Sequence, residues 1–134
     1  MSKNTENTTE KAYSAVIEFS NKELSAKERI MMKDTTACSQ LDELVQLGGE
    51  KLEIVPDTYA VINVHNEKSK DKKDYQKLVI IDKNGSRYVT GSESFTRTFR
   101  DLCDEMGDEE FSVLVFKKES KNYAGKGFLT CTIA

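Results

Sequence analysis

The dipeptide Asn84-Gly85 lies between two strand-like runs, residues 77–82 and 86–90. Both residue types tolerate a positive φ, so this spacing predicts a two-residue type I′ turn and therefore a β-hairpin. The register set by such a turn would put Tyr88 on the face of the hairpin away from Ile80. Two strands joined by so short a turn pair antiparallel, so residues 77–90 are predicted to belong to an antiparallel sheet.

Apolar residues elsewhere recur with the spacing of strands and of one long helix. Alternating or continuous apolar runs predict strands at residues 13–19, 52–55, 58–66, 111–116 and 128–133. An apolar stripe that includes Phe95 and Phe99 predicts a helix. This helix would start after Ser92 or Ser94 and end at Gly107.

Residues 20–50 carry the signals of short helices. Ser25 and Glu28 have the spacing of a capping box, which predicts a helix directly after Ser25. Ser39 is placed to cap a second short helix, which the pair Gly48-Gly49 would end. We expect both helices to pack against another part of the fold.

With residues 52–55 and 58–66 counted as one strand interrupted at Pro56-Asp57, the predicted order from residue 52 onward is strand, strand, strand, helix, strand, strand, with a tight turn between strands two and three. This is the order of an OB-fold, a five-stranded Greek-key barrel, here with a helix between strands three and four. We therefore predict a mainly β protein with a single OB-fold domain over residues 12–134. Residues 12–50 would form an N-terminal extension with one strand and short helices, and residues 51–134 would form the barrel. The polar residues 1–11 are expected to be disordered.

Two lysine-rich segments, residues 68–77 and 117–126, separate charge along the chain. They hold nine of the 20 Lys and Arg residues and three of the 23 Asp and Glu residues, a net charge of +6, whereas the rest of the chain carries −9. In an OB-fold they fall in the two loops that this fold uses for oligonucleotides, here residues 67–77 and 117–127. This separation of charge indicates a binding site for a polyanion.

Lysine and aromatic side chains match what a nucleic-acid single strand exposes, which is its phosphates and the faces of its bases. Stacking on an aromatic ring contributes about 1–3 kcal/mol per base and tolerates any sequence. Because neither loop contains arginine, which can bind guanine through two hydrogen bonds, we expect little base readout. The predicted nucleic-acid-binding residues are Lys68, Lys70, Lys72, Lys73, Lys77, Lys117, Lys118, Lys121 and Lys126, with Tyr75, Tyr88, Tyr123 and Phe128 as stacking platforms. For Tyr88 and Phe128 a packed position fits the sequence equally well.

Several other classes of protein find no support in the sequence. Cys38, Cys103 and Cys131 are far apart and lack metal-ligand spacing, and His65 is the single histidine. We therefore expect no metal, no cofactor and no enzymatic activity. The longest uninterrupted apolar run, residues 78–81, is too short to cross a bilayer, and residues 1–10 lack the apolar stretch of a secretory signal. We expect a cytoplasmic location.

Three stretches of the chain resemble small phage-encoded single-stranded DNA-binding proteins with an OB-fold. They are residues 59–67, 91–95 and especially 120–131, and the resemblance covers roughly residues 50–134. It implies that the protein coats exposed DNA during phage replication, recombination or repair, in the cytoplasm of a host cell. It also implies that protomers can associate, and that replication or recombination proteins are candidate partners.

The leading alternative belongs to a different class of protein. The acidic body of the chain, or residues 20–50, could dock a host protein, for instance to inhibit it. This interpretation predicts no affinity for oligonucleotides, so a binding measurement separates the two hypotheses.

Overall fold

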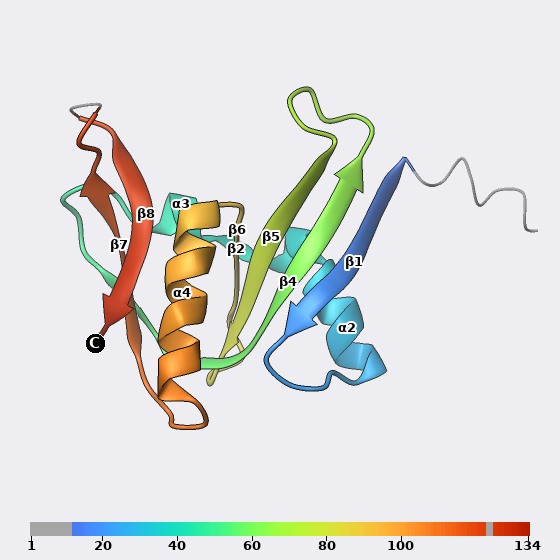
Figure 1. Cartoon of the computed structure of the whole chain (residues 1–134), viewed down its shortest axis with the longest axis horizontal. Coiled ribbons are helices and arrows are strands. Elements are labelled where there is room, and N and C mark those ends of the chain that lie inside the picture. The colour runs from blue at the N-terminus through green and yellow to red at the C-terminus, as the bar shows by residue number, and fades with distance from the viewer. Residues whose placement is uncertain (1–11, 123–124) are drawn as a thin grey trace, which may run out of the picture.

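One extended stretch of the chain, residues 52–66, belongs to two different sheets. The computed structural model describes residues 12–122 and 125–134. In it, β3 (Leu52–Ile54) pairs with β7 (Val113–Glu119), and β4 (Pro56–Asn66) pairs with β5 (Asp74–Asp82) (Figure 1). The register shifts between Pro56 and Thr58, where the chain passes from one sheet to the other. Because proline cannot donate a ladder hydrogen bond, a bulge is a position where it is tolerated within a sheet.

The protein is mainly β, with one sheet of five strands and one of three. The larger sheet has the order β1 (Tyr13–Ser20), β4, β5, β6 (Arg87–Thr90), β2 (Ser39–Gln40), and the smaller has the order β3, β7, β8 (Gly127–Ile133). The two sheets do not close into a barrel, since no pairing joins β6 to β8 in the described part of the chain. The predicted five-stranded barrel is therefore not confirmed.

Residues 39–47 lie where the barrel would have closed. β2 pairs in parallel with β6, and Leu47 forms an isolated parallel bridge with Lys117 of β7. This pairing changes the second predicted helix. Ser39 belongs to β2 and caps no helix, while α3 (Leu41–Leu44) forms a single turn that ends before Val45. The strand pairing overrides the local helix signal in this segment.

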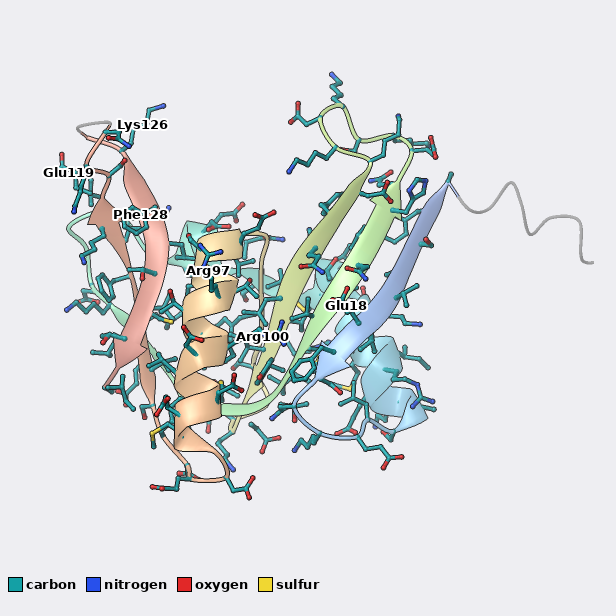
Figure 2. All side chains as sticks on the ribbon, in the orientation of Figure 1. Glu18, Arg97, Arg100, Glu119, Lys126 and Phe128 are labelled. Carbon is teal, nitrogen blue, oxygen red and sulfur yellow. The ribbon has the colours of Figure 1, made fainter. Side chains whose placement is uncertain are left out.

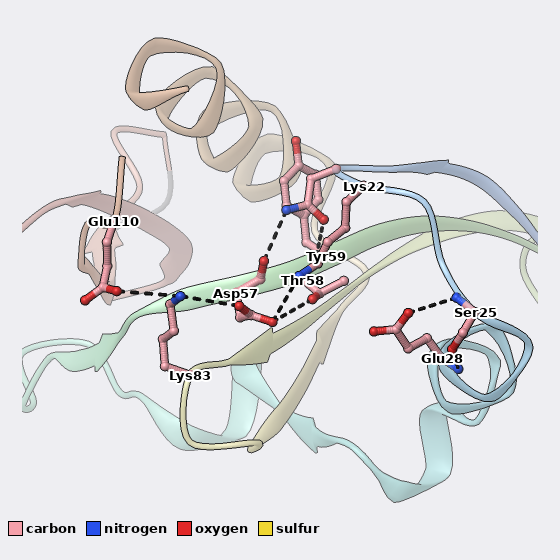
Figure 3. Close-up of polar contacts among 9 residues, drawn as sticks. Lys22, Ser25, Glu28, Asp57, Thr58, Tyr59, Lys83 and Glu110 are labelled. Atoms are coloured by element: carbon pink, nitrogen blue, oxygen red, sulfur yellow. Dashed lines mark hydrogen bonds and ion pairs between the residues drawn. The ribbon is translucent and has the colours of Figure 1, made fainter. Parts of the chain in front are cut away.

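The capping box at Ser25 is confirmed. The Ser25 hydroxyl accepts from the Glu28 backbone N–H at 3.1 Å, and the Glu28 carboxylate accepts from the Ser25 N–H at 2.8 Å (Figure 3). These bonds satisfy two orphan donors at the start of α2 (Ala26–Lys33), which is followed by the 3₁₀ turn η1 (Thr35–Ala37). Met32 is the buried residue of α2, whereas Ile30 is 69% exposed.

The long helix is also confirmed. In α4 (Glu93–Met106), the Ser92 hydroxyl accepts from the Phe95 N–H at 3.2 Å, and Gly107 ends the helix with a φ of +62°. Figure 1 shows α4 between the two sheets. Phe95 and Phe99 are fully buried there and form the centre of the first core.

Two hydrophobic cores lie on opposite faces of the five-stranded sheet. The first contains α4, α3 and the inner face of the three-stranded sheet. The second lies between the sheet and α2, and includes Met32, Ile62 and Val64. Leu129 and Cys131 of β8 point into the first core as predicted, but Ile133 is 43% exposed because the strand ends there. Burial raises the pKa of Cys131 to about 12.

The hairpin of β5 and β6 has a different turn from the predicted one. Gly85 has a φ of +90° while Asn84 does not have a positive φ, and the Gly85 N–H donates to the Asp82 carbonyl at 2.9 Å. The turn is one residue longer than a two-residue loop, so Tyr88 lies opposite Ile80. A shift of one residue moves a side chain to the other face of a sheet. Tyr88 consequently packs against the first core, which corrects its predicted position.

In the described part of the chain, no helix is long and apolar enough to cross a membrane.

Candidate nucleic-acid interface

The two lysine-rich loops project from the same end of the molecule. The loop of residues 67–73 joins β4 to β5, and the loop of residues 120–126 joins β7 to β8. Figure 1 shows both hairpin ends at the top of the view, on either side of the first turn of α4. Both loops are shorter than predicted because β5 starts at Asp74 and β7 continues to Glu119. We call them the β4–β5 loop and the β7–β8 loop.

The β4–β5 loop exposes all four of its lysines. Lys68, Lys70 and Lys72 are exposed and form no ion pair with any described residue. Lys73 differs, since its Nζ donates to the Glu67 carbonyl at 2.9 Å and lies 3.9 Å from the Glu67 carboxylate. Three lysines of this loop are thus available for phosphates, and the fourth is partly neutralised.

His65 joins the two strands at the base of the β4–β5 loop. Its Nδ1 lies 2.7 Å from the Asp74 carboxylate, and its Nε2 lies 2.6 Å from the Glu67 carboxylate. The pKa of His65 is raised above its ordinary value, mainly by the hydrogen bond to Asp74 and to a smaller extent by the hydrogen bond to Glu67. No partner for His65 could be predicted from the sequence, because pairing across a hairpin depends on the register. Protonated, it would offset two carboxylates beside the loop lysines.

The β7–β8 loop is held by its own backbone. The Glu119 carboxylate accepts from the Gly125 N–H at 2.8 Å, and the Ser120 N–H donates to the Lys126 carbonyl at 2.8 Å. Gly125 has a φ of +82°, a conformation that favours glycine. A Cβ at Gly127 would lie 3.2 Å from the Lys117 Cβ and 3.3 Å from the Leu47 Cβ, so Gly127 permits a close approach inside the protein.

The lysines of the β7–β8 arm divide into two groups. Lys117 points to the inner side, where its Nζ donates to the Asp42 carbonyl at 2.7 Å. Lys118, Lys121 and Lys126 are exposed and form no ion pair within residues 12–122 and 125–134. Lys117 therefore supports the fold at α3, and the other three remain candidates for phosphate contacts.

Among the predicted stacking platforms, Phe128 has the exposure that stacking requires. It is 42% exposed and lies opposite Lys118 on the face of β7 and β8 away from the first core. Tyr75 instead packs against the second core, with the Lys77 Nζ 5.9 Å from its ring centroid. Tyr88 packs against the first core, and Tyr123 lies outside the described residues.

A second aromatic ring and a further lysine share the face with Phe128. The Lys51 Nζ lies 4.8 Å from the centroid of Phe116, and Phe116 is the diagonal neighbour of Phe128 across β7 and β8. We call Lys51, Phe116, Lys118 and Phe128 the outer-face patch. The sequence placed Phe116 in a continuous buried run. Strict alternation with the buried residues Val113 and Val115 would have shown that it points outward.

Two arginines on α4 were also missed. Figure 2 shows Arg97 and Arg100 on the side of the helix toward β5, β4 and β1, where the Arg100 guanidinium lies 4.4 Å from the Phe19 ring centroid. They line a cleft between α4 and the larger sheet. The cleft residues are Gln76, Gly91, Glu93, Thr96, Arg97, Arg100, Asp101 and Asp104. Because acidic side chains outnumber the two arginines there, the cleft is a poor site for a polyanion.

At the opposite end of the molecule, Lys22 and Lys83 pair with carboxylates. Asp57 lies 3.3 Å from the Lys22 Nζ and 3.4 Å from the Lys83 Nζ, and Lys83 also lies 3.5 Å from Glu110 (Figure 3). A hydrogen bond from Thr58 is the main cause that lowers the pKa of Asp57. The end of α4 and the turn after it, residues 101–110, add six acidic residues at this end. Lys22 and Lys83 are thus neutralised at this end, whereas six lysines of the two loops and their arms have no carboxylate partner among the described residues.

Comparison of the chain with protein-family models, with curated proteins and with solved structures returned no match.

Proposed function

We propose that the protein binds single-stranded DNA with little sequence specificity, through its two basic loops and the outer-face patch. The observation that carries the proposal is the position of the β4–β5 loop and the β7–β8 loop, which are distant in sequence but project from one end of the molecule (Figure 1). A single strand of DNA is a flexible polyanion and can therefore contact both loops at once. A role in DNA replication, recombination or repair is part of the same proposal.

The distribution of charge supports binding of the ligand at the end of the molecule that carries the two loops. Lys68, Lys70 and Lys72 in one loop and Lys121 and Lys126 in the other are exposed. The six acidic residues within 101–110 lie at the other end, where a phosphate backbone would be repelled. The field of the molecule would therefore steer a polyanion to the loops.

The outer-face patch supports the preference for a single strand over a duplex. Phe128 presents an exposed ring beside Lys118, and an unpaired base can stack on an aromatic ring while its phosphate meets a neighbouring lysine. Bases within a duplex have no free face for such a contact. Stacking accepts every base, so this arrangement favours binding without sequence preference.

The order of strands supports an open OB-fold as the architecture. The stretch β3–β4 acts as one bent strand that pairs with both β5 and β7, β5 pairs with β6, and β7 pairs with β8. The helix α4 lies between β6 and β7 in the chain. This is the OB-fold order with residues 39–47 in place of the closing strand pair.

Fluorescence anisotropy with labelled dT oligomers across a salt series tests the proposal. If about five lysines contact phosphates, log affinity should fall with log salt with a slope near −3.5, since each contact on a single strand contributes about −0.7. Lys70→Glu should weaken binding and make the salt slope shallower by about 0.7. Lys27→Glu on α2, far from the loops, is the matched control and should change neither quantity.

The outer-face patch has its own pair of variants. Phe128→Ala should weaken binding by about 1–3 kcal/mol, whereas Phe128→Tyr should keep the stacking surface and the affinity. A duplex of the same length should bind more weakly than dT. Absence of oligonucleotide binding, or an affinity that does not depend on salt, would overturn the proposal and favour a protein–protein interaction module instead.

A further inference from the structure

The strand β1 forms one edge of the five-stranded sheet. Its inner edge pairs with β4, and no described residue pairs with its outer edge (Figure 1). An edge strand presents a row of unpaired N–H and C=O groups, which can pair with a strand of another chain. The groups of β1 that face outward determine what kind of strand this edge can bind.

The ladder with β4 determines which backbone groups of β1 are unpaired. The Ala12 carbonyl accepts from the Glu67 N–H at 2.8 Å, so Ala12 belongs to a hydrogen-bonded pair with β4. In an antiparallel ladder such pairs alternate along the strand. The N–H and C=O groups of Tyr13, Ala15 and Ile17 consequently point away from β4. A bulge between Ile17 and Phe19 ends this regular stretch.

The side chains of β1 do not protect this edge. Val16 is 58% exposed and Tyr13 is 48% exposed, although both are large apolar residues. Natural edge strands are commonly protected from pairing by lysine, by proline or by inward-pointing charges. Residues 13–17 contain none of these, and Glu18 at the bulge is the one charged residue of the strand.

We propose that two copies of the protein associate through antiparallel pairing of their β1 strands, with a two-fold axis at Ala15. This centre brings Tyr13 of one copy opposite Ile17 of the other, and all three outward-facing residues then exchange hydrogen bonds across the axis. The two five-stranded sheets become one continuous sheet.

The strand is complementary to itself in this register. Tyr13 and Ile17 form an aromatic and β-branched cross-strand pair on one face, twice by symmetry, and Ser14 lies opposite Val16 on the other face. Glu18 falls opposite Ala12, so no like charges meet. A partner of different sequence is not needed to satisfy any of these groups, which is why we assign the edge to a second copy.

Sedimentation or light scattering across a concentration series tests the proposal without DNA. Wild-type protein should move from its monomer mass of 15.2 kDa toward twice that mass as the concentration rises. The inference does not depend on the proposed function, because dimerisation and oligonucleotide binding are measured separately. A wild-type protein that stays monomeric at every concentration would overturn it.

Two double variants test the register. Ser14→Lys with Val16→Lys places lysine opposite lysine across the axis and should raise the dissociation constant more than about tenfold. Ser14→Lys with Val16→Glu places opposite charges there and should retain the dimer. Equal dissociation constants for the two variants would contradict the proposed register, and circular dichroism would check that both are folded.

A proline variant tests the backbone contact itself. Since the Ala15 N–H points outward, Ala15→Pro should preserve pairing with β4 while it removes both hydrogen bonds that the two Ala15 residues exchange across the axis. A folded Ala15→Pro protein that still dimerises like wild type would count against the proposal. So would a wild-type monomer that dimerises only after residues 1–11 are deleted, because the chain's own N-terminus would then be the occupant of the edge.

Discussion

The imidazole of His65 bridges two carboxylates that belong to opposite ends of one loop. Its hydrogen bonds to Asp74 at 2.7 Å and Glu67 at 2.6 Å favour the protonated ring. A pKa that is higher in the folded than in the unfolded chain stabilises the folded state below the unfolded value, and this stabilisation is lost as the pH rises through the folded value. The β4–β5 loop should therefore be held most firmly at mildly acidic pH.

An NMR titration of His65 checks this prediction, and assignment is simple because the chain has one histidine. We expect a pKa above the ordinary 6.5 in the wild-type protein and a lower value in Asp74→Asn. Protection factors of the amides in the β4–β5 loop, which correct for the base catalysis of exchange itself, should fall as the pH rises through the raised pKa of His65. An unshifted wild-type pKa would mean that neither hydrogen bond persists in solution.

The turn between β5 and β6 shows how one element can decide the position of a residue beyond it. The Asp82 carboxylate accepts from the backbone N–H groups of Asn84 at 2.9 Å and Ser86 at 3.0 Å. Asp82 thus starts a type I turn, for which aspartate is favoured at the first position and glycine at the fourth, here Gly85. The sequence contained this signal, but the pair Asn84-Gly85 indicated a shorter turn. Tyr88 was assigned to the wrong face for that reason.

Replacing Gly85 by alanine should destabilise the protein. Its φ of +90° lies in a region that costs an L-residue about 1–2 kcal/mol. Gly91→Ala is the matched control, because Gly91 lacks a positive φ and an added Cβ would meet nothing within 4 Å. Urea denaturation should show a lower midpoint for Gly85→Ala and an unchanged or slightly higher midpoint for Gly91→Ala. Equal midpoints would show that the turn rearranges without cost.

Helices were predictable where a local signal coincided with a buried stripe. The capping box at Ser25 and the Phe95–Phe99 stripe each depend on residues within two turns of one another, and both helices form as expected. The prediction of a helix capped by Ser39 was wrong because Ser39 pairs with Tyr88. This contact spans 49 positions of the chain, and no local pattern encodes it. The exposure of Phe116 and the position of the α4 arginines depend on packing of the same long-range kind.

For the whole molecule, the order of strands from residue 52 onward was predictable and the closure was not. The turn signal at Asn84-Gly85 and the apolar runs on either side of each loop define the hairpins β5–β6 and β7–β8. The edge of β6 that would pair with β8 in a barrel pairs instead with β2. Residues 39–47 run from that edge to the bridge between Leu47 and β7, and they bury Leu41 and Val45 in the first core. Nothing in that short segment has the period of a strand, so its place beside β6 could not be inferred from its residues alone.

The bent strand β3–β4 also sets the distance between the two basic loops. Its far end carries the β4–β5 loop, and its near end pairs with the arm that carries the β7–β8 loop. A ligand too short to bridge that fixed distance can engage one loop at a time, whereas a longer one gains the second contact intramolecularly. Affinity for dT oligomers should therefore rise in a step at a threshold length. Lys118→Glu with Lys121→Glu should remove the step and leave the weak binding of short oligomers. The bent strand would thus act as a molecular ruler, because it sets the length of exposed DNA that the protein can recognise.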